Sequence, residues 1–405
     1  MYIVIGQGIA GTTAAKTLRK LDPEHSLTII TDELDYLYSR VDLPDIISGK
    51  LEPSAAVLQQ AETFSGEGIN CLMGEKATAV IPAQKTVETA TGKRLQYDKL
   101  LIATGSVPVI PALPGIDSQG VYSLWTMHQA RAIITAAATA KSAVVVGAGL
   151  IGLKTALALR MRGLQVTVIE KLSRVMPRQL DDAAAAMLSS RLQHNGVTIT
   201  VNTGVDKIMS AKGAVEGVEA AGGFLPAEMV IMAIGVRPNT GLAAAAGIGV
   251  GQGIIVNELQ QTSQPDIYAA GDVAEMTDIG SGTATVPATW PAAVEQGRTA
   301  GHNMAGQKKI FNGRVIAMNA VEVAGMPLVS LGDINEKPGD AVLIAHRHDA
   351  YRKVVMRDKI VRGVLCVGEI RQAGVLGALI SRQVDIEEIE RLISPYFSFA
   401  DLIPA

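Results

Sequence analysis

Cysteine is scarce in this sequence, because its 405 residues include only Cys71 and Cys366. An iron–sulfur cluster normally takes four cysteine ligands, and a local dithiol takes two cysteines separated by two residues, so the chain supplies neither. The histidines show no metal-ligand spacing beyond His346 and His348, a pair that more often lines one face of a strand. We therefore expect no metal site, and any redox cofactor would have to be organic.

Basic charge is not in excess, and long apolar runs are missing. The formal net charge is −3 with a sequence pI of about 6.1, which gives no basic footprint for nucleic acid and no polybasic membrane patch. No apolar run reaches the roughly 20 residues that a membrane-spanning helix needs. A predicted strand starts at Tyr2 and leaves no room for a signal peptide. We expect a cytoplasmic protein that acts on small molecules.

A glycine-rich phrase occurs twice in the chain, first as "MYIVIGQGIAG" and again as "AVVVGAGLIG". Each copy is an apolar, β-branched run that breaks into G-x-G-x-x-G, which predicts a strand, a tight turn and a helix. Such a turn lets the backbone approach a pyrophosphate at a helix N-terminus. One copy is weak evidence for a dinucleotide site, whereas two copies are much stronger. The glycines concerned are Gly6, Gly8, Gly11, Gly147, Gly149 and Gly152.

Hydrophobic residues make up 48% of the chain, enough for more than one core, and its length suits two or three domains. We predict an α/β protein with two Rossmann-like, three-layer ββα dinucleotide-binding domains, one inserted in the other, and a C-terminal α+β domain. The predicted bounds are 1–113 and 241–308 for the outer domain, 114–240 for the inserted domain and 309–405 for the C-terminal domain.

The motifs as a set resemble a known family. "GQGIAG", "YDKLLIATGS", "GAGLIG", "AIGVRPN" and "DIYAAGDV" occur in the order and spacing of the pyridine-nucleotide:disulfide oxidoreductases, flavoproteins with two dinucleotide-binding domains. "YSRVDLPDIISG" and "SLGDI" look most like NADH:rubredoxin reductases and the FAD- and NAD-binding part of NADH-dependent nitrite reductases. The resemblance implies that the outer domain binds FAD and the inserted domain binds the nicotinamide cofactor NAD.

The resemblance also implies an FAD site. An acid near the end of the second strand usually holds the adenosine ribose in this family. Thr31 stands at that position here, and the acidic side chains of Asp32 and Glu33 follow it. They could bind the ribose or simply start a solvated loop. The residues expected beside FAD are Gly6, Gly8, Ile9, Ala10, Gly11, Arg40, Ala77, Ala103, Thr104, Gly105, Gly271, Asp272 and Trp290.

The predicted nicotinamide-cofactor site centres on Glu170, which closes the strand "VTVIE" eighteen positions after Gly152. A carboxylate there can bind both ribose hydroxyls of NADH and repel a 2′-phosphate, so NADH is preferred. Lys171 and Arg174 lie close by and could weaken that preference. The residues expected to line this site are Gly147, Gly149, Leu150, Ile151, Gly152, Glu170 and Gly235.

A redox-active cysteine is missing from the position where relatives carry one, before "LP", because this chain has Val41 there. The expected activity is therefore transfer of electrons from NADH through FAD to an external carrier protein, rubredoxin-like, or to a metal-containing partner subunit. A cysteine-independent NADH oxidase and an NADH-responsive sensor subunit are the alternatives. The chain is expected in an oligomer or a complex.

Aromatic residues are only 4% of the chain, yet Tyr396, Phe397 and Phe399 gather in the tail "PYFSFADLIPA". Aromatic side chains are favoured in interface cores. The tail could dock the electron acceptor or another subunit, or it could fold back onto its own domain.

Overall fold

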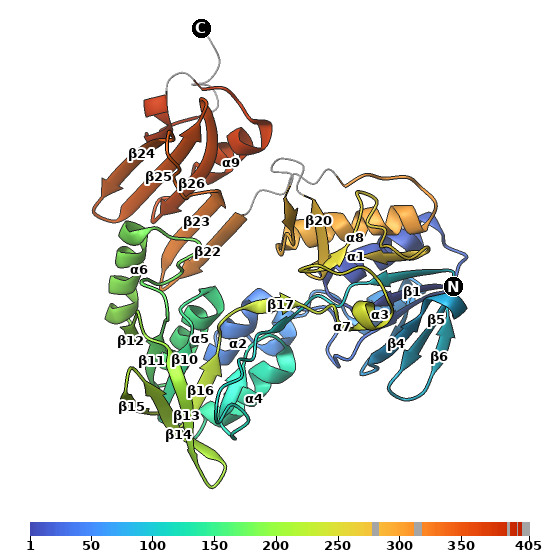
Figure 1. Cartoon of the computed structure of the whole chain (residues 1–405), viewed down its shortest axis with the longest axis horizontal. Helices are drawn as coiled ribbons and strands as arrows, with labels where there is room; N and C mark the ends of the chain where they lie inside the picture. The colour runs from blue at the N-terminus through green and yellow to red at the C-terminus, as the bar shows by residue number, and fades with distance from the viewer. Residues whose placement is uncertain (278–282, 312–317, 387–388, 395, 399–405) are drawn as a thin grey trace. The chain divides into compact units, whose positions relative to one another are not determined.

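The computed structural model describes residues 1–277, 283–311, 318–386, 389–394 and 396–398 (Figure 1). The chain divides into two compact units, and both are discontinuous in sequence. Unit 1 comprises Met1–Asp42, Leu51–Val107 and Val236–Val315, and unit 2 comprises Leu43–Lys50, Pro108–Gly235 and Ile316–Ala405.

Unit 1 is built on a parallel sheet with the strand order β19-β7-β1-β2-β3. All four residues of β1 and all four of β2 are apolar or β-branched and buried, as expected for strands covered on both faces. These strands are β1 (Tyr2–Ile5), β2 (Leu27–Ile30), β3 (Asn70–Leu72), β7 (Lys99–Ile102) and β19 (Ile267–Ala269).

Two layers cover this sheet. Tyr2 and Val4 point to a core shared with the helices α1 (Ile9–Leu21) and α8 (Trp290–Met304). Ile3 and Ile5, which alternate with them, belong to a core shared with a small antiparallel sheet. Unit 1 is therefore a three-layer arrangement around β1. The small sheet contains β4 (Ala77–Ile81), β5 (Thr86–Thr89) and β6 (Arg94–Gln96), and the shorter elements of the unit are α3 (Ala61–Gly66), α7 (Gly241–Ala245), β17 (Val236–Pro238), β18 (Ile254–Ile255), β20 (Ala274–Thr277) and β21 (Ala284–Thr285).

Unit 2 repeats this plan. Its parallel sheet has the order β12-β11-β10-β16-β9, and Val144 and Val146 of β10 pack against a three-stranded antiparallel sheet. The elements are α2 (Leu43–Ser48), β9 (Val121–Ser123), α4 (Met127–Ala137), β10 (Ser142–Val146), α5 (Leu150–Met161), β11 (Gln165–Ile169), α6 (Asp182–His194), β12 (Val197–Thr200), β13 (Val205–Ala211), β14 (Ala214–Ala220), β15 (Gly223–Pro226) and β16 (Met229–Met232).

The C-terminal part of unit 2 is an antiparallel sheet with the order β22-β23-β26-β25-β24, and α9 (Ala373–Arg382) packs on it. This all-antiparallel sheet with one helix confirms the predicted α+β character. The strands are β22 (Met318–Val323), β23 (Met326–Gly332), β24 (Ala341–Arg347), β25 (Ala350–Arg357) and β26 (Ile360–Val367). No helix in the described ranges is long and apolar enough to cross a membrane.

Candidate functional site

The two glycine turns use their first and third glycines for packing. Gly6 and Gly147 have φ of +104° and +107°, a region that side chains rarely adopt. A Cβ on Gly6 would lie 2.1 Å from the carbonyl oxygen of Ala103, and one on Gly11 would lie 2.0 Å from that of Gly6. Gly152 has the same relation to Gly147, at 2.1 Å. Only glycine therefore fits these positions in each turn.

The second glycine of each turn is different. A Cβ on Gly8 or Gly149 would meet no atom of the described chain within 4 Å, and neither residue has a positive φ. Both are helix N-caps, so α1 and α5 begin immediately after them, and the first N–H groups of an α-helix have no acceptor within the helix. Packing does not require glycine at these two positions, whereas a pyrophosphate lying against the backbone does. Both turns therefore fit a dinucleotide.

The remaining first-turn residues lie as the motif predicts. Ile9 and Ala10 form the start of α1, and Leu150 and Ile151 form the start of α5. Gly271, which follows β19, lies close to the start of α1. A Cβ on Gly271 would stand 2.9 Å from the Cβ of Ala10.

The carboxyl ends of β7 and β19 bring distant residues together. Ala103, Thr104 and Gly105 follow β7, and Asp272 follows β19, which pairs in parallel with β7. Ser106 Oγ donates a hydrogen bond to Asp272 Oδ2 at 3.1 Å. Ligands of parallel sheets bind at this edge, so these residues lie where the resemblance expects FAD.

Asp272 is a carboxyl group whose pKa is raised by its surroundings. Burial raises the pKa of its carboxyl above the usual value, and the hydrogen bond from Ser106 and the positive charge of Arg40 oppose that rise only in part. A partly buried carboxylate with few hydrogen-bond donors around it gains from a further donor. A hydroxyl group of a ligand can supply that hydrogen bond.

The residues near the end of β2 have other partners. Glu33 accepts hydrogen bonds from Arg40 and from the Tyr38 hydroxyl, each at 2.5 Å, and the Arg40 guanidinium lies 5.5 Å from the centre of the Tyr38 ring. Asp32 is exposed. The carboxylate of Glu33 is thus held by two side chains of its own segment, and its role at a ribose stays a prediction.

Thr31 and Glu170 occupy equivalent places in the two folds. Gly6 N–H donates to Ile30 O at 2.8 Å, and Gly147 N–H donates to Ile169 O at 2.7 Å, so the next residue of each strand lies beside its glycine turn. Thr31 is buried and its hydroxyl accepts from Glu33 N–H at 3.2 Å. The position that carries the acidic Glu170 in the second fold therefore carries the neutral Thr31 in the first.

Glu170 is buried against the second glycine turn. Its Oε2 accepts a hydrogen bond from Ala148 N–H at 2.7 Å, and its Oε1 accepts one from Leu172 N–H at 2.9 Å. A carboxylate oxygen can accept more than one hydrogen bond, so this anchored group keeps capacity for ribose hydroxyls. Gly235 has a φ of +118° with open space where a Cβ would stand, and its carbonyl accepts from Val109 N–H.

Two residues expected beside FAD lie at element starts in unit 1. Ala77 begins β4, and Trp290 begins α8 with 42% of its surface exposed. Thr289 caps α8 by accepting from Ala292 N–H at 3.4 Å. The positive end of this helix is thus well defined.

Sequence reasoning missed two polar residues of unit 1. Ser106 pairs with Asp272, and the fully buried Gln296 of α8 accepts a hydrogen bond from Gly271 N–H at 2.8 Å. Ser106 lies inside the motif "YDKLLIATGS", and Gln296 lies in the segment "AAVEQGR" shortly after Trp290. A polar residue within an otherwise apolar or glycine-rich segment was the available signal.

The two thiols are poorly suited to redox chemistry. Burial raises the pKa of Cys71, in β3, to about 11, and it also raises the pKa of Cys366, which is buried in β26. Val41, where the resemblance expects a cysteine, is 64% exposed. Across the described ranges no three His, Cys, Asp or Glu side chains form a group that could hold a metal ion.

Comparison with known proteins shows the family. Residues 1–297 match the model described as "Pyridine nucleotide-disulphide oxidoreductase", so the chain belongs to the pyridine nucleotide-disulphide oxidoreductases. Members of this family bind FAD and NAD(H), and the protein is an oxidoreductase. The predicted family, fold class and cofactors are confirmed.

Individual relatives have different names. The chain is 35% identical over 341 residues to an NADH oxidase of Methanocaldococcus jannaschii, covering 81% of this chain and 76% of that protein. It is 31% identical over 395 residues to a nitrite reductase [NAD(P)H] of Bacillus subtilis, covering 96% of this chain and 48% of the relative, so it spans about half that length. The structure of NADH:rubredoxin oxidoreductase from Clostridium acetobutylicum superposes with a TM-score of 0.80 at 26% identity, covering 96% of each chain.

Proposed function

We propose that the protein is an FAD-dependent NADH:acceptor oxidoreductase that passes electrons to an external one-electron carrier or to a metal-containing partner subunit, without a redox-active cysteine. The observation that carries this proposal is the pair of glycine turns that leave Gly8 and Gly149 open, combined with thiols whose pKa values are raised. The chain thus offers a site for each of two dinucleotides. Neither of its two thiols is suited to accept electrons from the flavin.

The residues of unit 1 would hold FAD. The N–H groups after Gly8 bind the pyrophosphate, and Asp272 accepts a hydrogen bond from the ribityl chain. Bound FAD supplies the ability to take up a hydride and release electrons singly or in pairs. The N-terminus of α8, beginning at Trp290, favours negative charge on the flavin ring.

The residues of unit 2 would hold NADH. The N–H groups after Gly149 bind its pyrophosphate, and Glu170 accepts hydrogen bonds from the adenosine ribose. Because Glu170 is already anchored by two backbone N–H groups, it presents a fixed negative charge that disfavours a 2′-phosphate. NADH is thus the preferred donor.

The acceptor is proposed from the relatives. One relative is a nitrite reductase of twice the length and a structural neighbour is named for rubredoxin, which supports a metal-containing acceptor. The relative named NADH oxidase supports direct reduction of oxygen as a second candidate.

The test starts with the purified protein. FAD should be released on denaturation at about one per chain, and anaerobic NADH should bleach the flavin band faster than NADPH. Reoxidation is then timed with oxygen and with a rubredoxin or ferredoxin. Release of FMN, or equal bleaching by the two donors, would contradict the proposal, and fast reoxidation by oxygen alone would favour the oxidase.

A further inference from the structure

The loop 171–180 of unit 2 connects the end of β11, where the nicotinamide-cofactor site is proposed, with the start of α6. Glu170 stands at its start, and Asp181, the N-cap of α6, stands at its end. Leu172 N–H donates to Glu170 at 2.9 Å, so the orientation of this carboxylate depends on where the loop backbone lies. Anything that fixes the loop therefore also fixes Glu170.

A few individual hydrogen bonds shape the loop. Met176 N–H donates to Ala148 O at 2.8 Å, within the glycine turn, and Met176 has a φ of +44°, which is unusual for a large side chain. Arg174 Nε donates to Leu180 O at 2.9 Å. The loop thus lies against the glycine turn. Its unfavourable backbone conformation at Met176 must be maintained by contacts with the surrounding structure.

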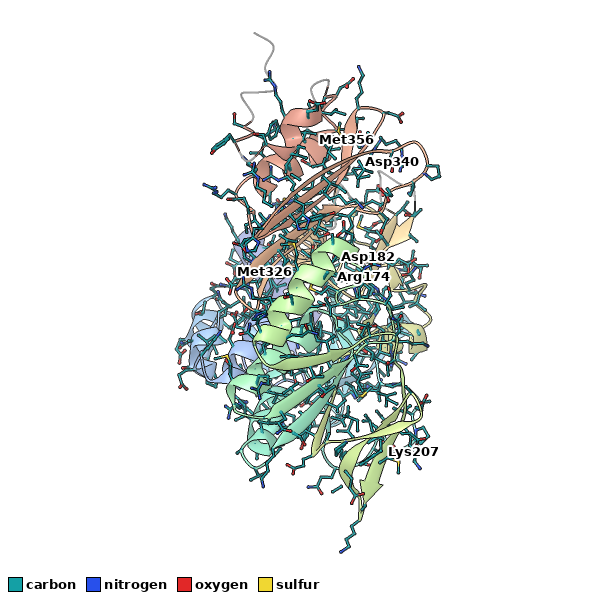
Figure 2. All side chains as sticks on the ribbon, turned by 90° about the vertical axis from the view of Figure 1, so that its left-hand side faces the viewer. Arg174, Asp182, Lys207, Met326, Asp340 and Met356 are labelled. Atoms are coloured by element: carbon teal, nitrogen blue, oxygen red, sulfur yellow. The ribbon has the colours of Figure 1, made fainter. Side chains whose placement is uncertain are left out.

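The C-terminal sheet holds the far end of the loop. Asp181 Oδ1 accepts from Ala184 N–H at 3.0 Å, while Oδ2 accepts from the hydroxyl of Tyr351 at 2.5 Å and lies 3.8 Å from Lys353 Nζ. Tyr351 and Lys353 both belong to β25 and both are buried. Figure 2 shows Asp182, the next residue, at the end of α6 nearest this sheet.

We propose that Tyr351 is a positioning residue for the adenosine ribose of NADH, acting through Asp181 and the loop on Glu170. The inference rests on the proposed function and gives the C-terminal sheet a part in cofactor binding. The Tyr351 hydroxyl fixes the carboxylate of Asp181, Asp181 fixes the end of the loop, and the loop fixes Glu170. Preorganisation of this kind lowers the cost of ordering a site when its ligand binds.

The test uses ligands that carry no redox chemistry. ADP-ribose and its 2′-phosphate derivative are titrated calorimetrically into the FAD-loaded protein and its Tyr351→Phe variant. We expect the variant to bind ADP-ribose about three- to tenfold more weakly and the 2′-phosphate derivative within about twofold of the parent, because only the former uses Glu170 favourably. In stopped flow, the NADH concentration for half-maximal bleaching should rise while the limiting rate stays unchanged.

Two further variants isolate the route. In a Glu170→Ala background, Tyr351→Phe should have no additional effect on ADP-ribose binding. The carboxylate through which Tyr351 acts on the ribose is then absent. Asp181→Asn, which keeps an oxygen for the helix cap, should reproduce the selective loss if Tyr351→Phe folds poorly. Tyr2→Phe is the matched control, since Tyr2 donates to Asp22 at 2.8 Å in unit 1, and it should change neither affinity.

The outcomes separate the hypotheses. Unchanged ADP-ribose affinity in Tyr351→Phe, or an equal loss for both ligands, would overturn the positioning role while leaving the proposed function in place. A parent protein that binds neither ligand would contradict the proposed function and this role with it.

Discussion

The hydroxyl of Ser106 donates a hydrogen bond to the carboxylate of Asp272 across 3.1 Å, although the two residues are 166 positions apart in the chain. The pairing follows from the parallel contact of β7 with β19, which places the segments after both strands at one edge of the sheet. The inserted domain lies between these strands in sequence but does not separate them in space. Under the proposed function, the FAD site is thus assembled from separate segments of unit 1.

Replacing Asp272 with asparagine should have opposite effects on stability and on FAD binding. Burial raises the pKa of Asp272 in the folded protein, so its contribution to stability is fully present below the unfolded-state pKa and is lost as the pH rises through the folded-state pKa. The flavin-free variant should therefore gain about 1 kcal/mol over the parent at pH 8 and less at pH 4.5. Thermal unfolding at both values measures this.

FAD binding by the same variant should weaken by about tenfold or more, because a charged acceptor for a ligand hydroxyl is lost. Quenching of FAD fluorescence by the flavin-free protein gives the affinity. Ser106→Ala is the companion change, and it should weaken FAD binding less, since it leaves the carboxylate in place. An asparagine variant that keeps full affinity would show that Asp272 does not touch the cofactor.

Alanine at Gly8 should abolish FAD binding without unfolding the protein. No atom of the described chain lies within 4 Å of the added methyl group, and φ at Gly8 is ordinary, so only the ligand competes with it. Gly6→Ala is the matched contrast, because its Cβ would lie 2.1 Å from Ala103 O and should lower the melting temperature. Flavin content and melting curves distinguish the two. Loss of the fold in Gly8→Ala would mean that the turn needs glycine for its own packing.

Removing both thiols should leave electron transfer from NADH to a dye largely intact. Burial raises the pKa of Cys71 to about 11, so at pH 7 only about one molecule in 10⁴ carries the thiolate that redox exchange requires. Cys71→Ser and Cys366→Ala are the suitable changes, since Cys366 is fully buried and a hydroxyl there would cost stability. A folded double variant that cannot reoxidise its flavin would refute the thiol-free mechanism.

The repeated glycine turn made the fold predictable, because the succession of an apolar strand, spaced glycines and a helix is visible in sequence. The apolar strand, the positive φ at Gly6 and the close contact at Gly11 all belong to one short segment. The place of Glu170 was predictable in the same way, since it directly follows its strand and accepts a hydrogen bond from the adjacent turn. Its role in binding a ribose stays a prediction.

The remaining contacts depend on tertiary structure that no local pattern encodes. Glu33 follows β2 as a ribose-binding acid would, yet its partner is Arg40. The bond between Tyr351 and Asp181 joins residues 170 positions apart and has no motif. The predicted domain bounds remain a prediction, and in the structure the C-terminal sheet groups with the inserted fold in unit 2.

The tail residues Tyr396 and Phe397 should respond differently to alanine. Phe397 is 3% exposed within the core cluster that contains Leu376 and Leu392, so it packs on its own domain, whereas Tyr396 is 89% exposed. Phe399 lies outside the described residues. Phe397→Ala should therefore destabilise the protein by about 3–5 kcal/mol, and Tyr396→Ala should change stability by less than about 0.5 kcal/mol.

Tyr396 alone then tests whether the tail docks the acceptor. With an interface role, Tyr396→Ala should keep normal FAD content and normal anaerobic bleaching by NADH, yet transfer electrons to its carrier protein several-fold more slowly at limiting carrier concentration, because exposed aromatic residues contribute strongly where they become buried. Transfer to a small dye, which needs no docking surface, is the internal control. Equal rates for parent and variant with the carrier protein would remove Tyr396 from the docking surface.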